Sequence, residues 1–118
     1  KNGKGLRTFP LSANPGLTTA ISNDVNFESS LSFQLQTLGI AGDLVVLISS
    51  SGNSPNIIAA ANKARTLGMS IIGISGFGHS KLVQLSDHSL TIDSTNMQLV
   101  EDMHAVIGHL IYLYLIEK

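Results

Sequence analysis

The feature that most constrains the fold is an unbroken aliphatic run, Leu-Val-Val-Leu-Ile, at positions 44–48. A strand with one face in water alternates apolar and polar residues, whereas a strand covered on both faces does not. Such continuous runs are typical of parallel sheets, in which helices cover both faces. The run therefore predicts a buried strand of a parallel sheet, and residues 70–74, Ser-Ile-Ile-Gly-Ile, predict a second one.

Helical segments alternate with these strands. Apolar residues recur at helical spacing over residues 17–23 and 26–38. Serine is favoured just before a helix and proline at its first position, so Ser54 and Pro55 predict a helix that runs to about Leu67. The remaining predicted elements are a strand at 6–11, a short helix at 81–85, a strand at 88–92 and a long helix at 96–117.

Strands that alternate with helices build βαβ units with right-handed crossovers. We therefore predict an α/β fold, a doubly wound parallel sheet with helices on both faces, in one domain spanning residues 1–118. The last predicted helix is apolar on almost all sides, so we expect it to be buried, in a contact between subunits. Charged residues make up 13% of the chain, against about 25% in an ordinary soluble domain, which favours a homo-oligomer.

Composition excludes several classes of function. The net charge is −1 and no Lys/Arg run could follow a phosphate backbone, so we expect no nucleic-acid partner. The chain has no cysteine, which excludes disulfides and thiolate metal sites. No segment has the basic, apolar and small-residue parts of a signal peptide in that order, and we expect the apolar stretches to be too short to span a membrane. We therefore expect a soluble, cytoplasmic protein without a membrane partner.

A serine-rich loop, Ser-Ser-Ser-Gly-Asn-Ser at 49–54, follows the first buried strand. Ligands of open α/β sheets bind outside the carboxyl ends of the strands, which is where this loop falls. Gly52 permits a tight turn, the hydroxyl and N–H groups can donate to an anion, and the next helix directs its positive end there. The loop could therefore hold a phosphate group. A serine-rich loop that does no more than cap its helix fits the composition equally well.

Two other segments carry polar groups that could serve a site. Residues 75–80 leave the second strand at the same sheet edge and could close over a ligand, although taken alone they fit a plain glycine turn better. In the last helix, Glu101 and His109 are separated by about 80° of rotation and project from broadly one side. His104 points about 140° away from His109, so the two histidines do not form a simple metal-binding face.

Residues 42–54, Gly-Asp-Leu-Val-Val-Leu-Ile-Ser-Ser-Ser-Gly-Asn-Ser, closely resemble the core of sugar isomerase (SIS) domains. Within that superfamily the nearest likeness is to phosphoheptose isomerases, which convert sedoheptulose 7-phosphate to a glycero-manno-heptose 7-phosphate. Residues 21–24, 75–76 and 101–104, followed by His109, also fall in that family's order and spacing. The resemblance spans nearly the whole chain and implies the SIS fold, a flavodoxin-like three-layer sandwich.

The resemblance implies a role for each matching residue. The residues that would hold the sugar phosphate are Ser49, Ser50, Ser51 and Ser54, and those that would contact the sugar are Asn23, Asp24 and Glu101. His109 matches the family's catalytic histidine. Glu101 stands where the family usually has a glutamine that, in some members, helps this histidine bind zinc. The implied zinc site at Glu101 and His109 is weakened by that exchange.

Aldose–ketose isomerisation needs a base that takes the α-proton and an acid that protonates the enediolate, and histidine suits both near neutral pH. The family's second catalytic group is a glutamate on an N-terminal helix that follows a Gly-Asn-Gly-Gly-Ser loop, and this sequence contains neither. We therefore expect that N-terminal residues of the fold are missing and that the 118-residue chain alone is inactive. The family further implies a homotetramer and a place in the synthesis of lipopolysaccharide heptose.

Two other functions stay open. One is a non-catalytic SIS module that senses a phosphosugar or binds a protein, as relatives that bind the bacterial replication initiator do. A histidine at position 109 argues modestly against it, because a scaffold needs no acid–base group there. The other is a nucleotide-binding or response-regulator-like domain, which fits less well because clustered acidic residues and a Gly-x-Gly-x-x-Gly opening are absent from the sequence.

Overall fold

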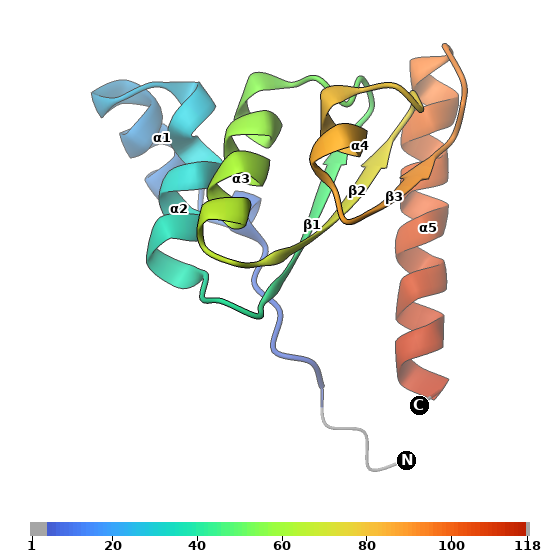
Figure 1. Ribbon diagram of the computed structural model, residues 1–118, viewed down its shortest axis with the longest axis horizontal. Coiled ribbons are helices and arrows are strands. Elements are labelled where there is room, and N and C mark those ends of the chain that lie inside the picture. Colours follow the sequence, from blue (N-terminus) through green and yellow to red (C-terminus); the bar gives the residue numbers. More distant parts are fainter. Residues whose placement is uncertain (1–4, 118) are drawn as a thin grey trace.

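Three parallel strands form the sheet in the computed structural model, which describes residues 5–117. β1 (Leu44–Ser49), β2 (Ser70–Ser75) and β3 (His88–Thr91) lie in the order β1-β2-β3. The parallel register pairs Val46 with Ile72, and Ile72 with His88. All three strands therefore end at the same edge of the sheet, uppermost in Figure 1. The predicted parallel sheet is confirmed.

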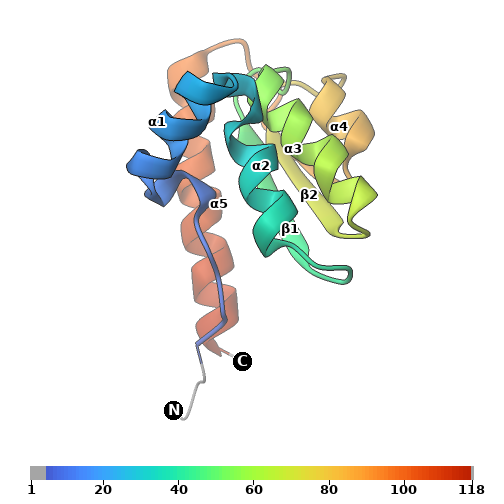
Figure 2. The ribbon, with the colours of Figure 1, turned by 90° about the vertical axis from the view of Figure 1, so that its left-hand side faces the viewer.

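Helices lie on both sides of the sheet, as predicted. They are α1 (Pro15–Asp24), α2 (Ser30–Leu38), α3 (Pro55–Thr66), α4 (Lys81–Leu85) and α5 (Met97–Glu117). α3 and α4 connect successive strands and, with α2, lie on one side, whereas α5 lies on the other (Figures 1 and 2). α1 packs against α2 and against the short 3-10 helix Phe27–Ser29 that joins them.

The hydrophobic core lies beneath α3. Val45 and Leu47 of β1 and Ile71 of β2 point into it and meet Leu35 of α2 and Leu82 of α4. The fully buried residues of α3 are small, Ala60, Ala61 and Ala64, and Ile57 and Ile58 pack against the core from its first turn. Because alanine projects little from the helix, α3 can lie close to the sheet and hold the loop before it in place.

The opposite face of β1 is open, which corrects the expectation that this strand is covered on both faces. Its burial alternates along the strand, and Leu44, Val46 and Ile48 are 57%, 43% and 46% exposed. On the same face of the sheet, the neighbouring strand β2 is covered, because its Ile74 is buried. An aliphatic run predicts that both faces of a strand are covered by other parts of the protein, but residues 5–117 cover only one face of β1.

α5 is not the buried helix that its composition predicts. Among its described residues, Val100 and Ile107 are buried and the others are exposed or partly exposed. By length and composition alone, the helix is also long and apolar enough to cross a membrane. This corrects the expectation that the apolar stretches are too short to do so. Core helices of globular proteins pass the same test, so this finding is weak evidence for a membrane.

The strand predicted at residues 6–11 does not form. Residues 6–10 have no regular structure, and Leu11–Ala13 form a single 3-10 turn. A strand needs a neighbour to accept its backbone hydrogen bonds, and this segment runs away from the sheet in Figure 1. The first α-helix, α1, begins after Asn14, whose side-chain oxygen caps it by accepting a hydrogen bond from the Leu17 amide at 3.0 Å.

Candidate functional site

The loop between β1 and α3, residues 50–54, lies at the carboxyl edge of the sheet and makes a tight turn at Gly52. The φ angle of Gly52 is +64°, in the left-handed region that other residues rarely adopt. A Cβ atom at Gly52 would collide with the Ser80 side chain and lie 3.2 Å from Cβ of Ser75. The serine loop therefore packs closely against the loop that follows β2, and glycine is what allows this.

Three serine side chains of the loop form hydrogen bonds within it, and two of them bond to each other. Oγ of Ser49 and Oγ of Ser54 lie 3.0 Å apart and share one bond, and Oγ of Ser49 also accepts from the Gly52 amide at 3.1 Å. One of the two hydroxyl protons occupies the shared bond, so the other is free for a ligand. Oγ of Ser51 accepts from the Asn53 amide at 3.2 Å, which leaves its own proton free to donate.

The first turn of α3 adds backbone donors to the same place. Ser54 precedes α3 as predicted, but its hydroxyl turns to Ser49 and does not cap the helix. Within residues 5–117, the amides of Ser54 and Asn56 have no hydrogen-bond acceptor. Unpaired amides at the positive end of a helix, beside free hydroxyl protons, suit a phosphate or another anion. The simple helix-capping interpretation of the loop does not account for this arrangement.

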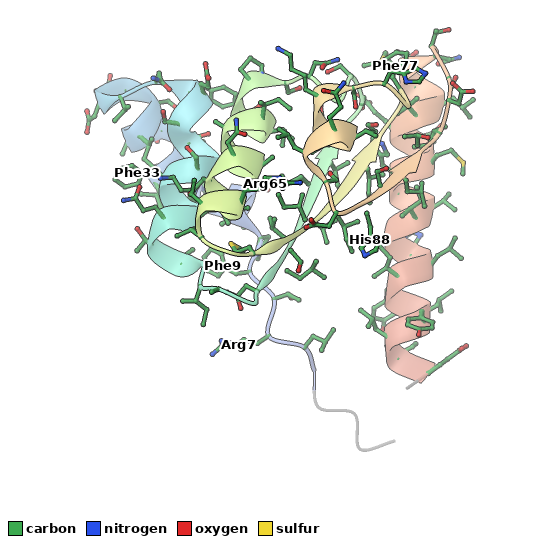
Figure 3. All side chains as sticks on the ribbon, in the orientation of Figure 1. Arg7, Phe9, Phe33, Arg65, Phe77 and His88 are labelled. Carbon is green, nitrogen blue, oxygen red and sulfur yellow. The ribbon has the colours of Figure 1, made fainter. Side chains whose placement is uncertain are left out.

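The loop after β2 braces the serine loop and links it to α5. The Gly76 amide donates to the carbonyl oxygen of Ser50 at 2.9 Å. A Cβ atom at Gly76 would lie 2.7 Å from that oxygen and 3.0 Å from Cγ2 of Val100. The serine loop, the loop after β2 and the first turns of α5 therefore meet at one glycine. Figure 3 shows Phe77 of this loop at the edge where the strands end.

Asn23 and Asp24 bond to each other and not to the serine loop in the part of the chain that the structure describes. They end α1, both are exposed, and Nδ2 of Asn23 donates to Oδ1 of Asp24 at 2.9 Å. Among the described residues, no hydrogen bond joins either one to residues 49–54. Their predicted contact with a sugar stays a prediction.

Glu101 and His109 are exposed on α5, as separate groups. Eight residues of helix separate their Cα atoms by about 12 Å along the axis, too far for a direct hydrogen bond. No group of three His, Cys, Asp or Glu side chains that could hold a metal occurs within residues 5–117. The implied zinc site therefore does not fit the described residues, which supply at most two of its ligands.

His104 lies between these residues in sequence and has a different environment. Its Nε2 atom is buried without a hydrogen-bond partner in the described part of the chain. Burial lowers the pKa of His104 below 6.5, and the nearby Glu101 carboxylate opposes this shift without cancelling it. Helical spacing placed His104 away from His109, but no sequence pattern indicated that its Nε2 atom would be buried.

An apolar cavity of about 240 Å³ lies elsewhere, between the N-terminal segment and the first two helices. It is lined by Phe9, Leu17, Phe33, Gln34, Thr37 and Leu38. None of these residues belongs to the serine loop, so the cavity and the candidate anion site are distinct. Sequence reasoning gave no role to Asn53 and Ser80 individually, although both lie in segments that it named: Asn53 bonds to Ser51 and to the Lys81 amide, and Ser80 packs against Gly52.

Comparison with protein families gives a match to one family model, described as the SIS domain, over residues 17–111. A phosphoheptose isomerase from Nitratidesulfovibrio vulgaris, strain Miyazaki F, is 38% identical over 106 residues, which are 90% of this chain and 51% of that protein. A phosphoheptose isomerase from Campylobacter jejuni is 37% identical over 109 residues, 92% of this chain and 59% of that protein. The chain thus spans about half the length of the curated relatives it matches.

Solved structures give the same result for the fold. A phosphoheptose isomerase from Neisseria gonorrhoeae superposes with a TM-score of 0.88 at 30% identity, over 92% of this chain and 60% of that chain. One from Francisella tularensis has a TM-score of 0.87 at 27% identity, over 92% of this chain and 58% of that chain. The family match includes most of α5, so this apolar helix is part of the matched domain.

Proposed function

Because this chain belongs to the SIS domain family, we propose that it is the phosphosugar-binding part of an aldose–ketose isomerase that acts on sedoheptulose 7-phosphate. The observation that carries this proposal is the serine loop, where free hydroxyl protons and unpaired amides converge at the positive end of α3. Its support comes from phosphoheptose isomerases that are similar over about nine tenths of the chain.

The serine loop binds the phosphate group of the sugar in this proposal. The donors are the hydroxyls of Ser49 or Ser54, of Ser50 and of Ser51, with the amides at the start of α3. These groups are neutral, so they bind the phosphate through directed hydrogen bonds and the helix dipole, without a lysine or arginine. The phosphate then anchors the substrate and leaves the sugar carbons free to extend toward α5.

His109 is the acid–base residue of the reaction. Isomerisation breaks a C–H bond beside the carbonyl, forms an enediolate and places a proton on the neighbouring carbon, so no oxidant or reductant is needed. A neutral imidazole can take a proton in one step and, as imidazolium, return it in another. Asn23, Asp24 and Glu101 are proposed to contact the sugar hydroxyls. No step of this proposal passes through zinc, because the described residues do not complete a metal site.

The exposed apolar surface supports assembly with further copies of the chain. Leu44, Val46 and Ile48 are open on one face of β1, and most side chains of α5 are exposed. We propose a homotetramer that buries part of this surface, in the cytoplasm, where the product would serve lipopolysaccharide heptose synthesis. Light scattering on the full-length protein tests the assembly, and a monomer at micromolar concentration would contradict it.

The test of the proposed function is His109→Gln in the full-length protein, with His88→Gln as the matched control. His88 is also exposed and begins β3, at the sheet edge away from the serine loop (Figure 3). We expect His109→Gln to lower turnover of sedoheptulose 7-phosphate at least about a hundredfold. Its affinity for the sugar phosphate should stay within about threefold, and His88→Gln should change neither quantity.

Three outcomes would contradict the proposal. Unchanged turnover in His109→Gln would reject the catalytic role of His109. Binding of the sugar phosphate without any turnover by the wild-type protein would indicate a sensing module, and binding of neither sedoheptulose 7-phosphate nor glucosamine 6-phosphate would indicate a protein-binding scaffold.

A further inference from the structure

The serine loop satisfies the first backbone amides of α4, which lies beyond β2 in the sequence. The Lys81 amide donates to Oδ1 of Asn53 at 3.1 Å, and the Leu82 amide donates to the carbonyl oxygen of Gly52 at 2.9 Å. The next amide, Val83, donates to Oγ of Ser80 at 3.4 Å. Two of the three acceptors at the start of α4 therefore belong to the loop that we assign to phosphate.

Asn53 also holds the conformation of its own loop. Its Nδ2 atom donates to the carbonyl oxygen of Ser51 at 3.0 Å, and its backbone amide donates to Oγ of Ser51 at 3.2 Å. One side chain thus links the backbone of Ser51 to the start of α4, 28 positions along the chain from Asn53. In these bonds both oxygen atoms of Ser51 act as acceptors, so its hydroxyl proton stays free to donate.

We propose that Asn53 is a positioning residue for the phosphate group, which acts by fixing the Ser51 hydroxyl and the loop amides against α4. This inference rests on the proposed function only in that the serine loop takes a phosphate. Asn53 does not touch the reacting carbons, so its effect falls on binding and not on the chemical step. Its hydrogen bonds are exposed in the free protein, and a bound phosphate shields them from water, which strengthens them.

The alternative is that Asn53 is a cap of α4 with no effect on a ligand. Both interpretations predict faster exchange of the Lys81 amide when the side chain is removed. They differ in ligand binding, because a general loss of stability lowers the affinity for phosphorylated and unphosphorylated sugars alike. A positioning role lowers the affinity for the phosphorylated sugar and for inorganic phosphate selectively.

The test compares Asn53→Ala with Asn62→Ala in the full-length protein. Asn62 is an exposed residue of α3 that forms no side-chain hydrogen bond with the described residues. Asn62→Ala therefore removes the same side chain without breaking a link between the serine loop and α4. Loss of the two side-chain hydrogen bonds, one to the Ser51 carbonyl oxygen and one from the Lys81 amide, is expected to weaken binding of inorganic phosphate and raise KM for sedoheptulose 7-phosphate about tenfold. kcat should stay within about threefold, and competition by unphosphorylated sedoheptulose should not change.

Asn53→Asp separates the two bonds of the side chain. A carboxylate keeps an acceptor for the Lys81 amide but cannot donate to the carbonyl oxygen of Ser51, and it adds a negative charge near the phosphate. Hydrogen–deuterium exchange of a peptide covering residues 78–84 should therefore stay close to wild type. Phosphate affinity should fall further than in Asn53→Ala, and added salt should restore part of the difference.

The outcomes separate this inference from the proposed function. If Asn53→Ala binds inorganic phosphate like Asn62→Ala, or if it lowers affinity for the unphosphorylated sugar equally, the positioning role is wrong. If the wild-type protein binds phosphate but does not isomerise the sugar, the proposed reaction is wrong and the phosphate titration still decides the role of Asn53. A wild-type protein that binds no phosphate overturns both.

Discussion

Gly52→Ala tests whether the close approach of the serine loop to the loop after β2 holds the site together. Gly52 has a φ angle of +64°, and a Cβ atom there would collide with Ser80, which is 3% exposed, and contact Ser75, which is fully buried. Two costs therefore add. The left-handed backbone costs alanine about 1–2 kcal/mol, and forcing an extra methyl into a packed contact costs about 1–3 kcal/mol.

The expected loss of unfolding free energy is thus about 2–5 kcal/mol, a large part of the roughly 5–15 kcal/mol that holds a domain folded. Gly42→Ala is the matched control. Gly42 has a φ angle of +89°, but no atom lies within 4 Å of an added Cβ, so only the backbone cost of about 1–2 kcal/mol applies. The double variant Gly52→Ala/Ser80→Gly removes the collision and should recover most of the difference between the two single variants.

Denaturant unfolding of the full-length protein, followed by circular dichroism at one protein concentration, measures these losses. Titration with sedoheptulose 7-phosphate should show weaker binding in Gly52→Ala and unchanged binding in Gly42→Ala. The reasoning is refuted if the two single variants lose equal stability, or if the double variant is no more stable than Gly52→Ala.

Two further predictions concern stability. Asp87→Ala should cost about 1–3 kcal/mol, because Oδ2 of Asp87 accepts from the amide of the fully buried Ile71 at 2.8 Å. Arg65→Ala should cost about 1 kcal/mol or less, because its ion pair with Asp87 is 4.0 Å long between half-exposed side chains and its 2.9 Å bond to the Leu85 carbonyl oxygen is exposed; equal losses in denaturant unfolding would contradict this order. Burial lowers the pKa of His104, so the folded protein binds the proton less readily than the unfolded chain does, and stability should fall as the pH drops below about 6.5. His104→Gln should flatten that fall in melting temperature between pH 7.5 and 5.5, and an unchanged slope would exclude His104 as its source.

Local patterns were sufficient to predict most of the secondary structure and the place of the site. The aliphatic residues at 44–48 and 70–74 lie in β1 and β2, and Ser54 and Pro55 mark the start of α3 as predicted. These signals depend on backbone sterics and on side chains a few residues apart. The serine loop follows β1 directly, so a parallel sheet by itself puts it at the edge where ligands bind.

The remaining features depend on which distant segments meet. The strand expected at 6–11 had suitable residues but no neighbouring strand to pair with, and the exposed face of β1 shows that apolar residues do not reveal what covers them. For the same reason, the burial of the Nε2 atom of His104 and the exposure of most of α5 could not be predicted from helical spacing.

By itself, the sequence determined the order of strands and helices, the parallel sheet and the serine loop at its edge, because each depends on residues adjacent in the chain. The tertiary structure decided how that loop is held. Asn53 meets the Lys81 amide, and Gly76 lies between the Ser50 carbonyl and Val100. Such contacts arise because the parallel strands end at one edge of the sheet, which brings the loops after β1 and β2 together and places groups more than 20 residues apart within hydrogen-bonding distance.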